Sequence, residues 1–333
     1  MPDITNHVSR NFTTLLLTAA FFTFAAGIAL RAQPVLALSA HPALYDVEIE
    51  PGQTETRTVT IVNDTRSAET YLLTIQKFIP QGELGQQRFL DPSDTAGLPE
   101  WMFVDRPQVT LAPGQALPLP VTIRVPENAQ AGGYYAALFL SRSPSVGEEL
   151  AMLPRVGLLF FVRVKGPAVE RLTLEDFGPD ADGPYERLPV GFRVSLLNQG
   201  NVHLVPEGTI TVKNMFGATV ARLPVNPGSG RILPDSRRVY TAAWAKGESS
   251  EGSGYWHGLL QELSHFAVGR YRAKLELSGP GFATPVLSEV EFSVWPWRTG
   301  VALGGLSAAL LLLFFVFKRL AIRSATAKSD PLK

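Results

Sequence analysis

The ionisable residues of this chain give little sign of catalysis. The five histidines are His7, His41, His203, His257 and His265, and the last two are eight positions apart, too far for joint metal ligation on one helix. The sequence has no His-Glu-x-x-His zinc motif, no G-x-S-x-G nucleophile elbow and no phosphate-binding P-loop. It has no cysteine, which excludes zinc–thiolate sites and a cysteine nucleophile. We therefore expect no catalytic residues, no metal and no cofactor, and we predict that the chain is not an enzyme.

Closely spaced carboxylates do not change that expectation. Glu48 with Glu50, and Glu148 with Glu149, stand in strand or loop contexts that are typical of solvated faces. A glycosidase-type acid and base would need two such groups held on opposite sides of a substrate. Nothing in the spacing of these pairs predicts that arrangement.

Aromatic residues offer the first candidate binding surface. Trp101 and Phe103 lie near a long polar segment, and Tyr134 and Tyr135 lie in a GGYY strand. Aromatic rings pack well against the apolar face of a sugar, so these four residues are candidates for glycan stacking. The alternative is that they are ordinary core and edge residues. Adjacent strand residues point to opposite faces, so at most one of the two tyrosines faces the core.

A second candidate surface lies in the segment 255–266, YWHGLLQELSHF, which breaks the surrounding strand pattern. Its apolar residues fall at helical spacing and predict one apolar helix face, formed by Trp256, Leu259, Leu260, Leu263 and Phe266. Two interpretations stay open. The helix covers an edge of a β-sandwich, or it presents an apolar surface to a partner or to the membrane interface.

Strict alternation of apolar and polar residues dominates residues 41–166 and predicts a first β-sandwich. In 115–125, apolar residues alternate with Pro118, Pro120 and polar side chains, as in a strand with one buried face. Proline cannot donate to a ladder, so this strand is expected at a sheet edge. Further strands are predicted at 44–50, 70–79, 133–142 and 155–165, while 80–99 is predicted to be a long loop.

Residues 167–296 predict a second sandwich. The strand around Phe192 ends at Asn198-Gln199-Gly200-Asn201, a strong turn signal, and NMFGATV around Phe216 predicts a hairpin. Other strands are expected at 208–213, 218–223, 238–244, 270–277 and 287–294. The fold class is therefore all-β, with two tandem antiparallel immunoglobulin-like sandwiches.

The order of these landmarks resembles a known family. IEPGQTETRTVTIVND, a segment ending in Trp101, and VTLAPGQALPLPVTIRVPENAQAGGYYAALFLS follow one another as in the first exterior domain of the WxL-interacting proteins of Gram-positive surfaces. They are similar, more loosely, to the N-terminal domain of periplasmic pilus chaperones. The resemblance implies a peptidoglycan-binding first domain, and a second domain that contacts host or partner proteins. It assigns no individual ligand residues.

Apolar segments flank the two sandwiches. Residues 1–37 predict a signal peptide, with small residues near Ala37, although an uncleaved anchor is the alternative. Residues 299–317 carry no charge and are long enough to span a bilayer, and Trp295 and Trp297 precede them. The segment 318–333 is a basic tail, which the positive-inside rule places in the cytoplasm.

Composition agrees with an exported binding protein. Net charge is zero and no cluster of Lys and Arg suggests nucleic-acid binding. We predict a single-pass protein of the plasma membrane, with most of the chain extracellular or periplasmic. Its predicted role is non-catalytic binding of cell-wall peptidoglycan, of another surface protein, or of both. The alternative is a chaperone-like assembly factor for secreted or pilus-like subunits, which would need a free strand edge such as 115–125.

Overall fold

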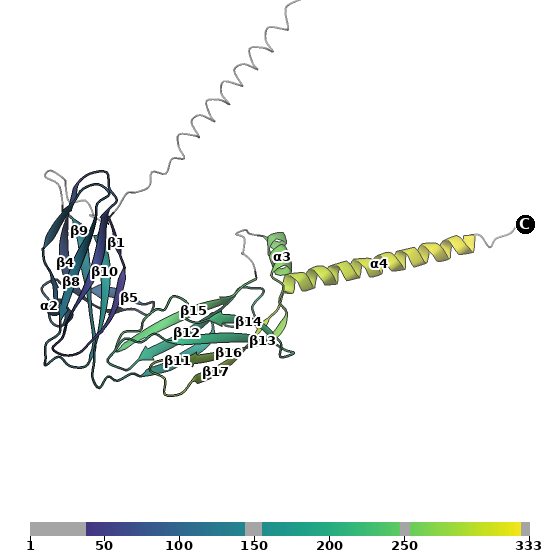
Figure 1. Cartoon of the computed structure of the whole chain (residues 1–333). Coiled ribbons are helices and arrows are strands. Elements are labelled where there is room, and N and C mark those ends of the chain that lie inside the picture. Colours follow the sequence, from purple (N-terminus) through teal and green to yellow (C-terminus); the bar gives the residue numbers. More distant parts are fainter. Residues whose placement is uncertain (1–37, 144–154, 247–253, 328–333) are drawn as a thin grey trace, which may run out of the picture.

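The protein consists of two β-sandwiches followed by a long helix (Figure 1). The computed structural model describes residues 38–143, 155–246 and 254–327. The predicted all-β class with a C-terminal apolar helix is confirmed. The expected signal peptide, residues 1–37, lies outside the described residues.

The first sandwich packs a four-stranded sheet against a larger one. The four-stranded sheet has the order β1-β3-β8-β6 and the larger sheet the order β2-β10-β9-β4-β5, with β7 also pairing with β4. Its core includes Val59, Ile61, Leu138 and Phe160, all fully buried. The elements are β1 (Leu38–His41), β2 (Leu44–Ile49), β3 (Thr54–Asn63), β4 (Glu69–Gln81), β5 (Gln86–Phe89), α2 (Leu98–Trp101), β6 (Met102–Val104), β7 (Gln108–Leu111), β8 (Ala116–Arg124), β9 (Gly132–Arg142) and β10 (Arg155–Val164).

The second sandwich is smaller. Its sheets have the orders β11-β12-β15 and β14-β13-β16-β17. Phe192, Ile210, Leu275 and Val294 lie in its core. The elements are β11 (Leu172–Pro179), β12 (Val190–Asn198), β13 (Glu207–Asn214), β14 (Thr219–Pro224), β15 (Ser236–Trp244), α3 (Tyr255–Ser264), β16 (Gly269–Ser278) and β17 (Val286–Val294).

The structure differs from the sequence prediction in the segment 80–99. The sequence predicts one long loop here, but the segment completes a β4–β5 hairpin and ends in the first two residues of α2. Glycines with positive φ at Gly82 and Gly85 permit the tight turn between the two strands. The turn touches the second domain, where the Val239 amide donates to the Glu83 carbonyl oxygen at 2.7 Å.

The strand predicted at 115–125 is an edge strand in part only. β8 pairs with β3 along most of its length, and β6 covers its other side from Val121 to Ile123. The first half of β8 therefore keeps an unpaired side, and this half holds Pro118 and Pro120. A proline removes a ladder donor, so this side is a poor template for another strand.

A buried asparagine closes the end of one strand in each sandwich. Asn63, at the end of β3, donates from its amide to the carbonyl oxygens of Leu111 at 2.9 Å and Ser67 at 2.8 Å. Its own oxygen accepts from the hydroxyl of Tyr71. Asn198, at the end of β12, donates in the same way to the carbonyl oxygens of Val202 and Ile232. These side chains satisfy loop carbonyls that would otherwise be buried without partners.

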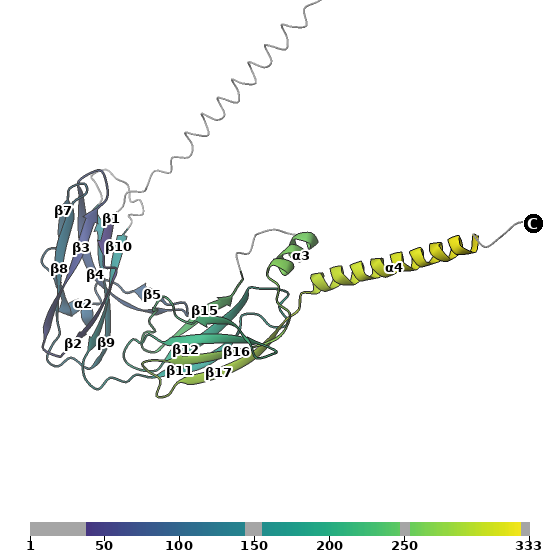
Figure 2. The same cartoon turned by 45° about the vertical axis from the view of Figure 1, so that its right-hand side comes forward.

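The two sandwiches meet at a bend (Figures 1 and 2) and an ion-paired carboxylate lies at the junction. Asp46 on β2 accepts from Arg231 Nη2 at 2.8 Å and lies 3.2 Å from His203 Nε2. Burial opposes ionisation of Asp46, but the hydrogen bonds with His203 and Arg231 outweigh it and lower its pKa to about 2. The Gly133 amide also donates across the junction to the Asn201 carbonyl oxygen at 2.8 Å.

The C-terminal helix α4 (Trp297–Ala327) extends away from the second sandwich (Figure 1). Trp297–Leu320 is long and apolar enough to cross a membrane. Its mean hydropathy is 2.4, and none of its most apolar stretch is buried against the rest of the protein. The helix is thus longer than the predicted span 299–317 and includes the first part of the predicted basic tail, whose residues 328–333 lie outside the described residues.

Replacing Asn63 tests the strand-end network. We expect Asn63→Ala to lower the free energy of unfolding by about 2 to 4 kcal/mol, because it leaves buried carbonyls without donors. Asn214→Ala, in the exposed hairpin turn, is the matched control and is expected to cost less than about 1 kcal/mol. Denaturant unfolding of the full chain in detergent measures both. Equal losses would contradict the role given to Asn63.

Replacing Asp46 tests the junction. The pKa of Asp46 is lowered in the folded protein, so its ionised form stabilises the protein above about pH 4, and this contribution fades as pH falls towards 2. Its side chain is 42% exposed. Allowing for solvent screening, we expect Asp46→Asn to cost on the order of 1 kcal/mol at pH 7. Denaturation midpoints measured from pH 7 to pH 2 should converge with those of wild type at the acid end, and Asp182→Asn, in an exposed loop, serves as control.

Candidate functional site

The first group of predicted site residues does not form an open aromatic surface. Trp101 is only 9% exposed, and its ring lies 4.4 Å from that of Tyr134, which packs against the first core. Phe103 is exposed on β6 and lies under the guanidinium of Arg124 at 5.0 Å. The expected glycan-stacking arrangement is therefore not assembled, because the largest ring of the set is used in packing.

Tyr135 lies on the opposite face of β9 from Tyr134, at the junction of the two domains. Its ring packs near Phe78 at 5.8 Å and near His203 at 5.6 Å. Its hydroxyl is buried and makes no hydrogen bond with the described residues, and burial raises its pKa. The ring of Tyr135 thus contributes to the contact between the domains.

That contact is an apolar cluster on the outer face of the larger sheet of the first sandwich. Phe78, Phe139 and Phe161 are its buried aromatic members, and Leu233 reaches it from the second domain. The guanidinium of Arg231 covers Phe161 at 5.1 Å. The junction therefore combines apolar burial with the ion pair at Asp46, which favours one fixed bend over a free hinge.

A cavity of about 500 Å³ opens beside this cluster, between the domains. Apolar side chains line most of it, and Lys77 and Asp235 bring opposite charges to it. Its lining comprises Lys77, Phe78, Ile79, Pro80, Ala96, Gly97, Leu98, Gly133, Tyr134, Tyr135, Asn201, Leu233, Pro234 and Asp235. Such a cavity suits an apolar side chain of a partner.

The second group of predicted site residues lies on α3, and only part of it shares one face. Trp256, Leu263 and Phe266 are exposed, as is Leu260, whereas Leu259 is buried. Leu259 lies at the margin of the apolar stripe and turns towards the body of the domain, so the stripe is divided between the packed and the exposed sides of α3. The buried side of α3 also holds Glu262, which is fully enclosed.

The structure has a free strand edge on β10, whereas the sequence analysis predicted one at 115–125, on β8. β10 pairs with β9 along its whole length but with β2 only from Leu159 to Val164. On the β2 side, the described residues give Arg155 to Leu158 no strand partner, because β1 turns away to pair with β3. Among the described residues, the first half of β10 therefore carries no ladder on this side, although β1 passes close to β10, and we call Arg155 to Leu158 the open edge.

Hydrogen-bond geometry shows which groups this edge offers. The Leu159 amide donates to the Ala43 carbonyl oxygen on the β2 side at 2.9 Å. Strand groups alternate with a period of two, so the amides of Arg155 and Gly157 point to the same side. The ring of Phe139 lies over Gly157, where a Cβ would come within 2.7 Å of it. Glycine at 157 therefore allows an aromatic ring beside the open edge.

One sign of these missed residues is visible in the sequence. Leu158 to Val162 is apolar at every position, and such a run predicts a strand covered on both faces. The role of Asp46 had no such sign, because its partners His203 and Arg231 are more than 150 positions away. No group of three metal-ligating side chains gathers anywhere in the described ranges.

Comparison with known proteins gives only distant similarity. No family model matches the chain, and no curated protein matches its sequence. Among solved structures, a chaperone–tip adhesin complex of CFA/I fimbriae aligns with a TM-score of 0.39 and 11% identity over 76% of this chain and 97% of that one. The class 5 fimbriae chaperone CfaA aligns with a TM-score of 0.37 and 12% identity over 76% and 98%. The E. coli chaperone DraB aligns with a TM-score of 0.33 and 14% identity over 78% and 98%.

Proposed function

We propose that this protein is a non-catalytic, membrane-anchored binding protein that holds an extended segment of a partner protein, in the manner of a chaperone-like assembly factor. The observation that carries the proposal is the open edge of β10 at Arg155 to Leu158. An extended peptide can join such an edge as an additional strand and satisfy its free backbone groups.

The neighbourhood of the edge suits a strand with alternating side chains. One face of β10 presents Leu158, buried in the first core, and the other presents Gly157 beneath the ring of Phe139. The guanidinium of Arg155 lies 4.1 Å from the Phe139 ring and can move aside without breaking the ladder to β9. The edge therefore offers two backbone donors next to apolar surface on both faces of the sheet.

The first half of β8 is a weaker candidate for the same role. It was the strand expected to accept a partner, but Pro118 and Pro120 remove donors from its unpaired side. The open edge of β10 carries no proline. We therefore assign partner binding to β10.

Anchoring is part of the proposal. α4 would cross the membrane between Trp297 and Leu320, and the basic residues Lys318 and Arg319 favour a cytoplasmic C-terminus. Both sandwiches would then lie outside the cell or in the periplasm. Tethering raises the effective concentration of the edge near other membrane-associated proteins, so modest affinity would be sufficient.

The WxL-type role implied by the sequence resemblance stays a second proposal. It shares the surface location and the protein partner. We do not extend it to peptidoglycan, because Trp101 is buried and Tyr134 packs on it, which leaves only Phe103 of the suggested stacking residues exposed on β6.

A synthetic ten-residue peptide of alternating Thr and Val tests strand addition. We expect it to bind the full chain in detergent and to slow hydrogen exchange at the amides of Arg155 and Gly157. Arg155→Pro removes one of these donors and should weaken binding about tenfold or more. Arg155→Ala keeps the donor and should bind within about twofold of wild type.

The same peptide with every amide N-methylated is the control, because methyl groups then block both of its edges and it cannot pair with a strand on either side. Fluorescence anisotropy gives the affinities, and unfolding midpoints verify that both Arg155 variants fold. Binding that leaves exchange at Arg155 and Gly157 unchanged, or that N-methylation does not affect, would contradict strand addition at this edge.

A further inference from the structure

The start of α4 is fixed rigidly to the second domain through α3. The buried carboxylate of Glu262 accepts from the Thr299 amide at 2.8 Å and from the Thr299 hydroxyl at 2.9 Å. Arg298 donates to Glu262 at 3.2 Å and to Glu186 at 2.6 Å. A carboxylate near a helix N-terminus also complements the helix dipole. α3 is thus held beside the first turn of α4, where both views show it lying across the axis of the long helix (Figures 1 and 2).

The exposed side of α3 is an unbroken apolar stripe at the base of α4. Trp256, Leu260 and Leu263 follow the i, i+4, i+7 spacing of one helix face. Trp256 is 74% exposed and Leu263 is 53% exposed. Gln261 and Glu262 face the body of the domain, so the side of α3 that faces away from the domain is apolar, as expected of a surface that another apolar phase covers.

The hairpin between β13 and β14 ends at the same level. Val294, just before α4, pairs with Gly269, and Tyr271 pairs with Asn214 at the end of β13. The register therefore places the hairpin turn at the α4 end of the sandwich. Its tip holds Met215 and Phe216, and the Phe216 side chain is 86% exposed. We call Met215, Phe216, Trp256, Leu260 and Leu263 the basal surface.

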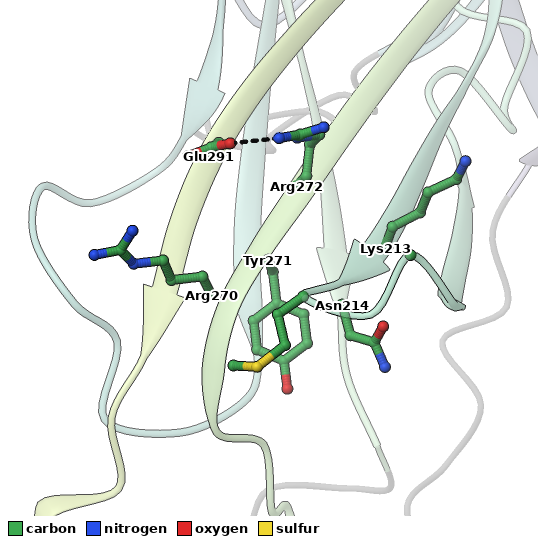
Figure 3. Close-up of a pocket in the computed structure, with 8 residues that line it drawn as sticks. Lys213, Asn214, Arg270, Tyr271, Arg272 and Glu291 are labelled. Carbon is green, nitrogen blue, oxygen red and sulfur yellow. Dashed lines mark hydrogen bonds and ion pairs between the residues drawn. The ribbon is translucent and has the colours of Figure 1, made fainter.

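Basic side chains stand directly above the hairpin tip. Lys213, Arg270 and Arg272 line a cavity of about 320 Å³, which Figure 3 shows around Tyr271. Lys213 and Arg272 are cross-strand partners and share the outward face of the sheet with Arg270. Arg272 pairs with Glu291 at 2.7 Å. Within the described residues, Lys213 and Arg270 have no acidic partner. Arg272 also pairs with Glu289 at 2.6 Å, so among the described residues the three cations exceed the two carboxylates by one positive charge next to exposed apolar side chains.

We propose that the basal surface rests in the headgroup layer of the bilayer that α4 crosses, with Lys213 and Arg270 facing lipid phosphates. This inference depends on the membrane anchoring in the proposed function. Continuity with the apolar helix favours lipid as the occupant, because α3 is fixed to the first turn of that helix. The charges agree, since cations beside an apolar surface match the phosphates above the acyl chains.

The absence of cysteine from the chain allows a direct test. Single cysteines at Phe216, Leu260, Leu84 and Leu310 are labelled with an environment-sensitive fluorophore in the full chain, at one copy per nanodisc. Leu84 lies in the first domain and is exposed to nearly the same degree as Leu260, 65% against 66%, so it is the matched control. Nanodiscs containing phosphatidylcholine and phosphatidylglycerol, with and without lipids carrying a nitroxide near the headgroup, supply the quencher.

We expect the nitroxide lipids to lower emission at 216 and 260 at least about twofold, and to leave emission at 84 unchanged. The double variant Trp256→Ser, Leu263→Ser should reduce the quenching at 216, whereas Leu84→Ser should not. Position 310 is tested with a nitroxide placed deep in the acyl chain.

The outcomes separate the two proposals. If 310 escapes quenching, the membrane anchoring fails and the basal surface fails with it. If 310 is quenched while 216 and 260 behave like 84, the inference about the basal surface is overturned and the anchoring stands. If 216 and 260 are shielded from aqueous iodide but not quenched by lipid, a protein covers the surface, which also overturns the inference.

Discussion

The junction between the two sandwiches is the contact on which the arrangement of the other features depends. Asp46 is held between His203 and Arg231, and the apolar cluster that includes Phe78, Phe161 and Leu233 packs beside it. Neither part alone would define the bend well: apolar contacts permit sliding, and an isolated surface ion pair contributes little. Together they fix position and register, because the carboxylate accepts from two directions while the rings fill the space next to it.

The chain has no disulfides, so its stability at exposed ends depends on buried polar side chains. Asn63 and Asn198 close the strand ends of the two sandwiches, and Glu262 closes the connection between α3 and α4. In each case a side chain satisfies backbone groups that have no ladder or helix partner. The same solution appears at three places where the chain leaves regular structure.

The sequence predicted those features that depend on local pattern. Alternation located the long strands to within a few residues, and helical spacing found α3. It failed where the outcome depends on distant parts of the chain. The β4–β5 hairpin contacts β15 of the second domain through the hydrogen bond from the Val239 amide to the Glu83 carbonyl oxygen. Trp101 is buried in part because Tyr134 packs on it. The open edge of β10 is invisible locally, since it arises from the change of sheet between β1 and β2.

A rigid junction and a rigid base have a joint consequence for partner binding. The contacts of Glu262 orient the second domain relative to α4, and the contacts of Asp46 orient the first domain relative to the second. With α4 in a bilayer, as proposed, the open edge of β10 would stay at one height above the membrane, whereas on a flexible stalk it would sample a range of heights. A fixed edge loses little orientational freedom on binding, which favours a partner presented at that height. It disfavours partners whose extended segment lies elsewhere. Selectivity would then come from geometry as well as from the side chains beside the edge.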